Sequence, residues 1–240
     1  MDITNIERHK GLFLIQNVKL RQIAKDNLID LELKDMIYAS GHGVGKNNTL
    51  DSIFSLVKLI KPKVSLVIGS GCGLIPRIIR EAQIDSNINH SKTYLIDLGE
   101  NMGAQPHLIH NKESLFRKLY PEIIVYNSYS YPDGLEFIKS KETGIDILWI
   151  DGDHTHEGSK KDFVFFSEFI NDNGLIFMHD TAPNGINNKQ PDWCGVNKTI
   201  DFIKESYKDK YELLNFTKIG DFEPGAGFAI IKKNLKKTNC

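Results

Sequence analysis

Two short segments of the chain concentrate the residues that could do chemistry. One reads Ile150-Asp-Gly-Asp-His154, the other reads Met178-His-Asp-Thr181, and each follows a near-continuous apolar run. Such runs are typical of buried parallel strands, whose carboxyl ends meet at one edge of a sheet, where ligands bind. Burying several carboxylates close together costs free energy unless a cation or bound protons neutralise their negative charges. Asp and His are common ligands of divalent metals. The sequence therefore predicts one site formed by Asp151, Asp153, His154, His179 and Asp180.

A glycine-rich turn precedes these segments in the chain. Residues 69–73 read Gly-Ser-Gly-Cys-Gly, directly after the apolar run Val64–Ile68 and directly before a helical pattern. Glycines there let the backbone turn sharply and approach a ligand beside the amides of a helix N-terminus. The nicotinamide dinucleotide fingerprint, Gly-x-Gly-x-x-Gly, needs a third glycine at position 74, which is Leu74. The turn therefore favours a different cofactor, and the plain alternative is a tight strand-to-helix turn without a ligand.

An acid ends the second predicted strand. Asp97 follows Thr93–Ile96, and a carboxylate at this place can accept both hydrogen bonds of a ribose diol. That role fits a nicotinamide cofactor equally well, and the alternative is that Asp97 only caps the following turn. Asn127 and Ser128 follow the third predicted strand, and we expect one of them to lie near an adenine ring.

The rest of the chain alternates apolar runs with amphipathic segments. The predicted strands are Val64–Ile68, Thr93–Ile96, Ile123–Tyr126, Ile145–Ile150 and Leu175–Met178. The amphipathic segments between them cover residues 74–82, 108–119, 134–139 and 157–170, and this alternation predicts an α/β fold with a doubly wound parallel sheet. Two last runs, at 211–217 and 227–232, share a short connection and must be antiparallel. We predict one domain over 49–240, a mostly parallel seven-stranded sheet closed by this hairpin, after a helical accessory or lid segment over 1–48.

The composition of the chain bears on its binding partners and on its location in the cell. The 240 residues carry a formal net charge of -1, which does not suggest a nucleic acid or an anionic membrane as partner. No stretch approaches the roughly 20 apolar residues of a membrane span. Three cysteines lie far apart without a Cys-x-x-Cys pair, which favours a reducing, cytoplasmic location. The oligomeric state stays open between a monomer and a homo-oligomer.

The two acidic segments give the chain a family resemblance. Asp-Gly-Asp-His at 151–154 and His-Asp-Thr at 179–181 resemble the signature of the macrocin O-methyltransferase and cephalosporin hydroxylase-like family, family 24 of methyltransferase domains, over about residues 51–232. The resemblance implies a Rossmann-like class I fold and a methyl transfer from S-adenosylmethionine to a hydroxyl of a small molecule, such as a sugar or natural product. It implies a divalent metal, Mg²⁺ or Mn²⁺, held by Asp151, His179 and Asp180, and Asp153 as general base. The glycine spacing and the strand-end residues predict the contacts of this cofactor: Gly69, Ser70, Gly71, Asp97, Asn127, Ser128 and Asp151.

The chain departs from the family pattern at two positions, and the identity of the base and the function each have alternatives. Val67 stands where the family often has an acid, and His179 stands where members have a second Asp, so a His in the metal shell would favour Mn²⁺ over Mg²⁺. His154 or His179 could be the base in place of Asp153, which could instead contact only the cofactor. Two other functions compete with methyl transfer: an NAD(P)-dependent oxidoreductase and a protein that binds S-adenosylmethionine without catalysis.

Overall fold

The computed structural model of the protein describes residues 49–69, 73–98, 112–182, 195–217 and 227–234. The predicted accessory segment 1–48 lies outside these residues, as do Ser70 and Gly71 of the glycine turn. Within the described residues no helix is both long enough and apolar enough to cross a membrane.

The described strands form one seven-stranded sheet in the order β3-β2-β1-β4-β5-β7-β6. The strands are β1 (Val64–Ile68), β2 (Lys92–Asp97), β3 (Ile124–Asn127), β4 (Ile145–Ile150), β5 (Ile170–His179), β6 (Tyr211–Phe216) and β7 (Phe228–Lys233). The first five pair in parallel, whereas β7 pairs antiparallel with both β5 and β6. The predicted fold class is therefore confirmed: a doubly wound sheet closed by an antiparallel pair of strands.

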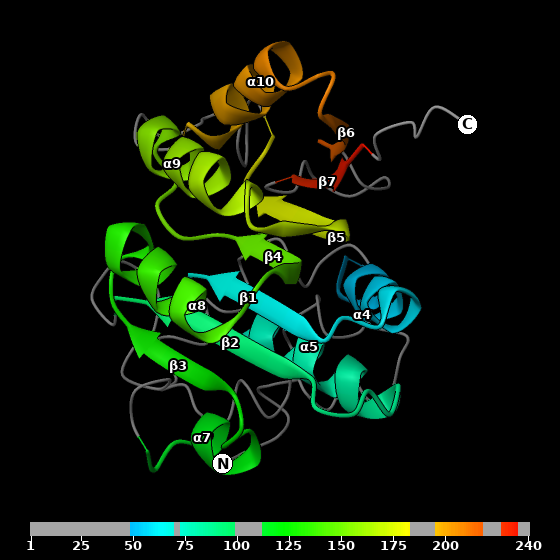
Figure 1. Ribbon diagram of the computed structural model, residues 1–240, viewed down its shortest axis with the longest axis vertical. Helices are drawn as coiled ribbons and strands as arrows, with labels where there is room; N and C mark the ends of the chain where they lie inside the picture. The colour runs from blue at the N-terminus through cyan, green and yellow to red at the C-terminus, as the bar shows by residue number, and fades with distance from the viewer. Residues whose placement is uncertain (1–48, 70–72, 99–111, 183–194, 218–226, 235–240) are drawn as a thin grey trace, which may run out of the picture.

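Helices cover both faces of the sheet (Figure 1). The helices are α4 (Thr49–Ile60), α5 (Leu74–Asp85), α7 (Leu115–Leu119), η3 (Ser130–Gly134), α8 (Leu135–Lys141), α9 (His156–Ser167) and α10 (Val196–Ser206). Side chains of α4, α5 and α7 pack into one apolar cluster, and those of α8, α9 and α10 pack into another. The sheet therefore separates two cores, one on each face.

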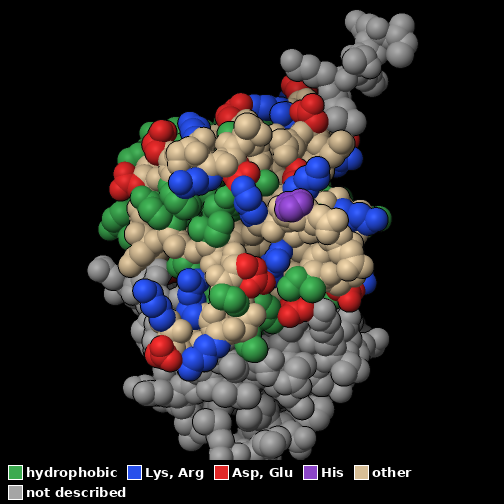
Figure 2. Space-filling view, turned by 60° about the horizontal axis from the view of Figure 1, so that its bottom comes forward, with side chains coloured by type: hydrophobic (Ala, Val, Ile, Leu, Met, Phe, Trp, Pro, Cys, Tyr) green, Lys and Arg blue, Asp and Glu red, His purple; other side chains and the backbone are tan. Residues whose placement is uncertain are grey.

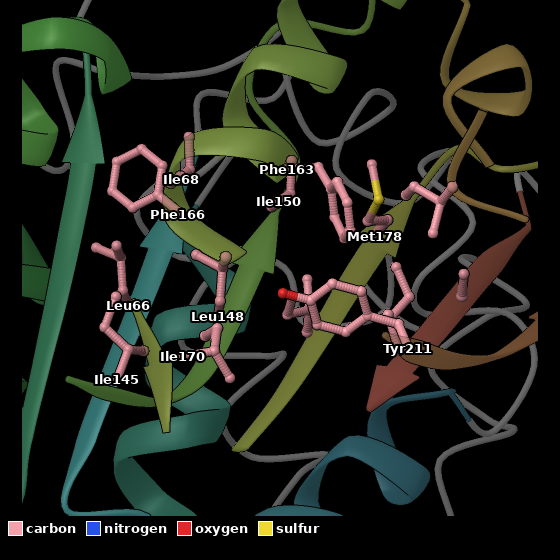
Figure 3. Close-up of a cluster of buried hydrophobic side chains, with 14 of the residues drawn as sticks. Leu66, Ile68, Ile145, Leu148, Ile150, Phe163, Phe166, Ile170, Met178 and Tyr211 are labelled. Atoms are coloured by element: carbon pink, nitrogen blue, oxygen red, sulfur yellow. The ribbon is translucent and has the colours of Figure 1, made fainter. Parts of the chain in front are cut away.

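Alternate residues of the central strands supply these two cores. In β4, Ile147 and Trp149 join the cluster under α4 and α5, whereas Leu148 and Ile150 join the cluster under α9. Figure 3 shows the second cluster, in which Ile68 lies near Phe166 and Ile150 near Phe163, both phenylalanines of α9. Because successive side chains of a strand point to opposite faces, a strand buried on both faces is apolar throughout. This is the physical origin of the apolar runs in the sequence.

One predicted boundary is wrong. The amphipathic pattern suggested a helix over residues 157–170, but α9 ends at Ser167 and Ile170 already belongs to β5. Ile170 pairs with Ile145 of β4, and the amide of Ile145 donates to the carbonyl of Phe169 at 2.9 Å. The chain leaves the helix early because these backbone groups find partners in the sheet.

Charged side chains of both signs share the face of the molecule shown in Figure 2. Lys and Arg side chains are interspersed there with Asp and Glu side chains. This mixed distribution agrees with the formal net charge of -1 for the whole chain.

Candidate active site

The first glycine of the turn packs directly against the Asp151 segment. Gly69 has a φ of +76°, and a Cβ placed on it would lie 2.2 Å from the carbonyl oxygen of Asp151. The amide of Gly69 also donates to the carbonyl of Ile96 at 2.9 Å. Only glycine fits at this position, because both the backbone angle and the close approach exclude a side chain. The turn after β1 and the acidic segment after β4 are therefore in contact.

The ends of β2 and β3 lie side by side at the same edge of the sheet. Asp97 and Asn127 are register partners, and the amide of Ser128 donates to the carbonyl of Asp97 at 3.2 Å. The side-chain amide of Asn127 lies 3.1 Å from that same carbonyl oxygen. The structure thus brings together three of the residues predicted to hold the cofactor, and their contact with it stays a prediction.

Two aspartates and two histidines form a compact group at the ends of β4 and β5, here called the Asp–His cluster: Asp151, His154, His179 and Asp180. His154 lies 3.3 Å from Asp151 through Nε2 and 2.9 Å from Asp180 through Nδ1. The Nδ1 atom of His179 lies 3.1 Å from Asp151 and 3.5 Å from Asp180. Each imidazole therefore contacts both carboxylates.

Local structure holds the two cluster residues at the end of β5, His179 and Asp180, in place. Asp180 has a φ of +57°, a left-handed conformation that is uncommon for a residue with a side chain and that occurs at functional sites. Thr181 next to it is buried and donates to Asn215 of β6 at 2.6 Å. The ring of His179 lies near that of Trp149, with 6.2 Å between centroids. The Asp–His cluster is thus supported by β4 and β6 as well as by its own turns.

Comparisons with known proteins agree with this architecture. Residues 66–181, which run from β1 through the Asp–His cluster, match the model of a methyltransferase domain family. This part of the chain is therefore similar to a methyltransferase domain, and the seven-stranded sheet has the Rossmann-like arrangement of class I S-adenosylmethionine-dependent methyltransferases. A comparison with curated protein sequences gave no match.

Solved structures share the fold of this protein at low sequence identity. One is an O-methyltransferase from Bacillus cereus in complex with SAH, with a TM-score of 0.64 and 15% identity over 96% of this chain and 97% of that one. An SAH-bound methyltransferase from Podospora anserina has a TM-score of 0.61 and 15% identity, over 91% and 89% of the two chains. TomG from Streptomyces achromogenes, an O-methyltransferase of tomaymycin synthesis in complex with SAM, has a TM-score of 0.59 and 12% identity, over 93% of each chain.

The charges of the Asp–His cluster stabilise one another. Burial alone would raise the pKa of Asp151, but His179 and His154 outweigh it and hold this pKa below its usual range. Burial alone would lower the pKa values of the two histidines, but the carboxylates of Asp151 and Asp180 raise them to about 11 for His154 and about 9 for His179. The raised pKa values favour the protonated form of both imidazoles, whose positive charges then oppose the negative charges of the two carboxylates.

The same residues fit a divalent metal. Asp151, His154 and Asp180 can each offer one ligand atom, and these atoms lie within 4.8 Å of one another. His179, the predicted third ligand, contacts the same two carboxylates, so its role as ligand stays a prediction. From the sequence, His154 is a candidate for proton transfer and is not assigned as a metal ligand. Its position three residues after Asp151 in a tight turn could have indicated that role, since residues three apart in such a turn can face each other.

Asp153 lies in the turn between β4 and α9. Its side chain is exposed, and Oδ1 accepts from the amide of Thr155 at 2.9 Å. Thr155 is the N-cap of α9 and accepts from the amide of Gly158 at 3.0 Å. His156, the first residue of α9, lies 3.0 Å from the hydroxyl of Thr199 in α10. Asp153 and His156 thus make these contacts at the start of α9 and with α10, while Asp153 stays in the same turn as Asp151 of the Asp–His cluster.

Proposed function

We propose that this methyltransferase transfers a methyl group from S-adenosylmethionine to a hydroxyl of a small molecule with the help of a divalent metal. The observation that carries the proposal is the Asp–His cluster, which lies at the carboxyl ends of β4 and β5 and whose residue Asp151 contacts Gly69 of the glycine turn. In a parallel sheet, ligands bind at this edge. A cofactor over the glycine turn and an acceptor at the cluster would therefore be neighbours.

The residues at the end of β2 and β3 would hold the nucleoside part of the cofactor. Asp97 would accept from the ribose hydroxyls, and the segment Asn127–Ser128 would contact the adenine. Gly69, Ser70 and Gly71 would line the side of the methionine moiety. The neighbours from Bacillus cereus and Podospora anserina were crystallised with SAH and TomG with SAM, which supports this choice of cofactor.

Methyl transfer forms a bond between the acceptor oxygen and the methyl carbon and breaks the bond between that carbon and sulfur. The hydroxyl proton must leave to a base, and S-adenosylhomocysteine is the second product. A divalent cation held by Asp151, Asp180 and a histidine of the cluster would lower the pKa of the hydroxyl and fix its orientation. The cluster residues themselves position the acceptor, which makes the reaction effectively unimolecular.

Asp153 is the proposed base for the acceptor proton. His154 and His179 are the alternative bases, and both contact the carboxylates of Asp151 and Asp180. Asp153 is exposed and lies two residues from Asp151 in the turn after β4. A carboxylate base contributes roughly 10²-fold or more to kcat. The variant Asp153→Asn should therefore lose about that factor and keep its affinity for the cofactor.

The Asp–His cluster and the structural neighbours suggest the chemical class of the methyl acceptor. A sugar or a natural product with two neighbouring hydroxyls could chelate a metal at the cluster, and a catechol could do the same. O-methyltransferases among the structural neighbours, such as TomG, support a hydroxyl acceptor. An oxidoreductase is disfavoured because Leu74 replaces the third glycine and because the sheet ends in the antiparallel strands β6 and β7.

The test combines binding and turnover. Isothermal titration with S-adenosylmethionine and with NAD, each in the presence of Mn²⁺, identifies the cofactor. A panel of sugars, catechols and other hydroxylated compounds is then screened for release of S-adenosylhomocysteine. Asp151→Asn should abolish turnover, and Asp172→Asn, an exposed aspartate paired with Lys233 on the surface, is the matched control. Binding of S-adenosylmethionine without turnover on any acceptor would favour a binding protein; full activity after removal of metal with EDTA would remove the metal from the proposal.

A further inference from the structure

Helix α9 carries a buried carboxylate to which the sequence analysis assigned no role. Asp162 is 2% exposed, and its side chain lies between α9, the end of the sheet and the segment that follows β3. The hydroxyl of Ser130, in η3, donates to its Oδ1 atom. Its Oδ2 atom is buried and has no hydrogen-bond partner among the described residues. This carboxylate is therefore only half satisfied.

The unpartnered side of Asp162 faces the turn of the Asp–His cluster. A Cβ placed on Gly152 would lie 3.7 Å from Oδ2 of Asp162 and 3.1 Å from Cγ2 of Ile68. Gly152 follows Asp151, whose carbonyl oxygen packs against Gly69 on the other side. Asp162 thus lies between two functional segments: Ser130, two residues after Ser128, and Gly152, next to Asp151.

Stability does not explain this side chain. A buried carboxylate with an unpartnered oxygen lowers stability, and replacing such a group by a neutral one is often neutral or stabilising. Burial raises the pKa of Asp162 to about 7, the hydrogen bond from Ser130 opposes this rise, and the charge of Asp153 adds to it. A group that lowers the stability of the fold is usually retained for function.

We propose that Asp162 is a positioning residue that joins the cofactor-side segment after β3 to the turn of the Asp–His cluster, so that binding at one site favours binding at the other. The inference rests on the proposed function, because it assumes a cofactor near Asn127–Ser128 and a metal at the cluster. Because one buried side chain accepts from Ser130 and lies beside Gly152, ordering either segment lowers the cost of ordering the other. Two ligands that share such an ordered unit bind with positive coupling.

The experiment measures this coupling directly and needs no acceptor. The dissociation constant of S-adenosylhomocysteine is measured by isothermal titration with and without saturating Mn²⁺, in the parent protein and in Asp162→Asn. Asn keeps the size of the side chain and an oxygen for Ser130, but it removes the charge and puts an amide NH₂ group in the place of Oδ2, the atom that faces Gly152. We expect Mn²⁺ to tighten S-adenosylhomocysteine binding by about 10-fold in the parent, a typical coupling, and by less than 2-fold in the variant.

Two more variants separate positioning from a general loss of structure. Ser130→Ala removes the same link from the other side and should reduce the coupling in the same way. Asp146→Asn is the matched control: Asp146 belongs to β4 but lies at the opposite end of the strand, where it accepts from the amides of Lys63 and Val64 at 2.8 and 3.0 Å. This control should lower the melting temperature and leave the coupling intact.

The outcomes distinguish this inference from the proposed function. Absence of S-adenosylhomocysteine or Mn²⁺ binding in the parent would contradict the proposed function. Binding of both ligands without coupling in the parent, or unchanged coupling in Asp162→Asn and Ser130→Ala, would overturn the role of Asp162 alone. Loss of coupling together with a raised melting temperature at pH 8 in Asp162→Asn would support the positioning role. If the role of Asp162 were purely structural, the substitution would lower the melting temperature as well as the coupling.

Discussion

The substitution Asp162→Asn should stabilise the methyltransferase at alkaline pH and have little effect on its stability at acidic pH. In the folded protein, burial raises the pKa of Asp162 from 3.8 to about 7. Between these two values the folded state holds a proton that the unfolded state has released. The contribution of Asp162 to stability therefore falls as the pH rises from about 4 to about 7 and is constant above that range.

The magnitude follows from the same pKa values. A rise from 3.8 to about 7 corresponds to about 4 kcal/mol of lost stability at pH 8. The Asn amide occupies the place of Oδ2 without a partner, which costs about 1–3 kcal/mol. A net gain of about 2 kcal/mol remains, and for a protein of this size it raises the melting temperature by about 4–8 °C.

The assay is thermal unfolding of the parent and of Asp162→Asn at pH 5 and at pH 8, in the absence of metal and cofactor. The difference between the two proteins should be small at pH 5, where Asp162 of the parent is protonated, and should reach its full size at pH 8. A melting temperature of the variant that is equal to or lower than that of the parent at pH 8 would refute the reasoning. Asp172→Asn, which changes an exposed carboxylate, should show no such dependence on pH.

Three further predictions concern the cofactor and metal sites. Gly69→Ala should destabilise the fold by about 1–3 kcal/mol or more, because its methyl group would meet the Asp151 carbonyl at 2.2 Å; a melting temperature equal to that of the parent would contradict this contact. Asp97→Ala should weaken S-adenosylmethionine binding by about 2–3 kcal/mol through the loss of two ribose hydrogen bonds, which isothermal titration measures, and unchanged affinity would disprove the assignment. The affinity for Mn²⁺ should rise at least about tenfold per pH unit between pH 6 and 8, because a ligand His must first lose its proton and the pKa values of His154 and His179 are raised to about 11 and about 9. Electron paramagnetic resonance measures this affinity, and a value that does not change with pH would exclude both histidines as ligands.

The sequence by itself determined the fold class and the edge of the sheet where the site lies. Strands such as Val64–Ile68 and Ile145–Ile150 are apolar at all positions but one because both of their faces are covered, and this pattern can be read without a structure. The positions of Gly69, Asp97 and Asp151 directly after their strands placed them at one edge, since all parallel strands end there. These inferences depend only on local periodicity and on chain order.

The tertiary structure decided which side chains face one another. His154 and Asp153 are neighbours in one turn, yet His154 contacts Asp151 and Asp180 while Asp153 accepts from Thr155 at the start of α9. No periodicity governs side-chain directions in an irregular turn, so the spacing could not separate them. Asp162 had no signal of its own, because its partner Ser130 is 32 residues away and their contact exists only once α9 has packed beside η3. Contacts of this kind depend on how separate elements pack, and local sequence patterns do not contain that information.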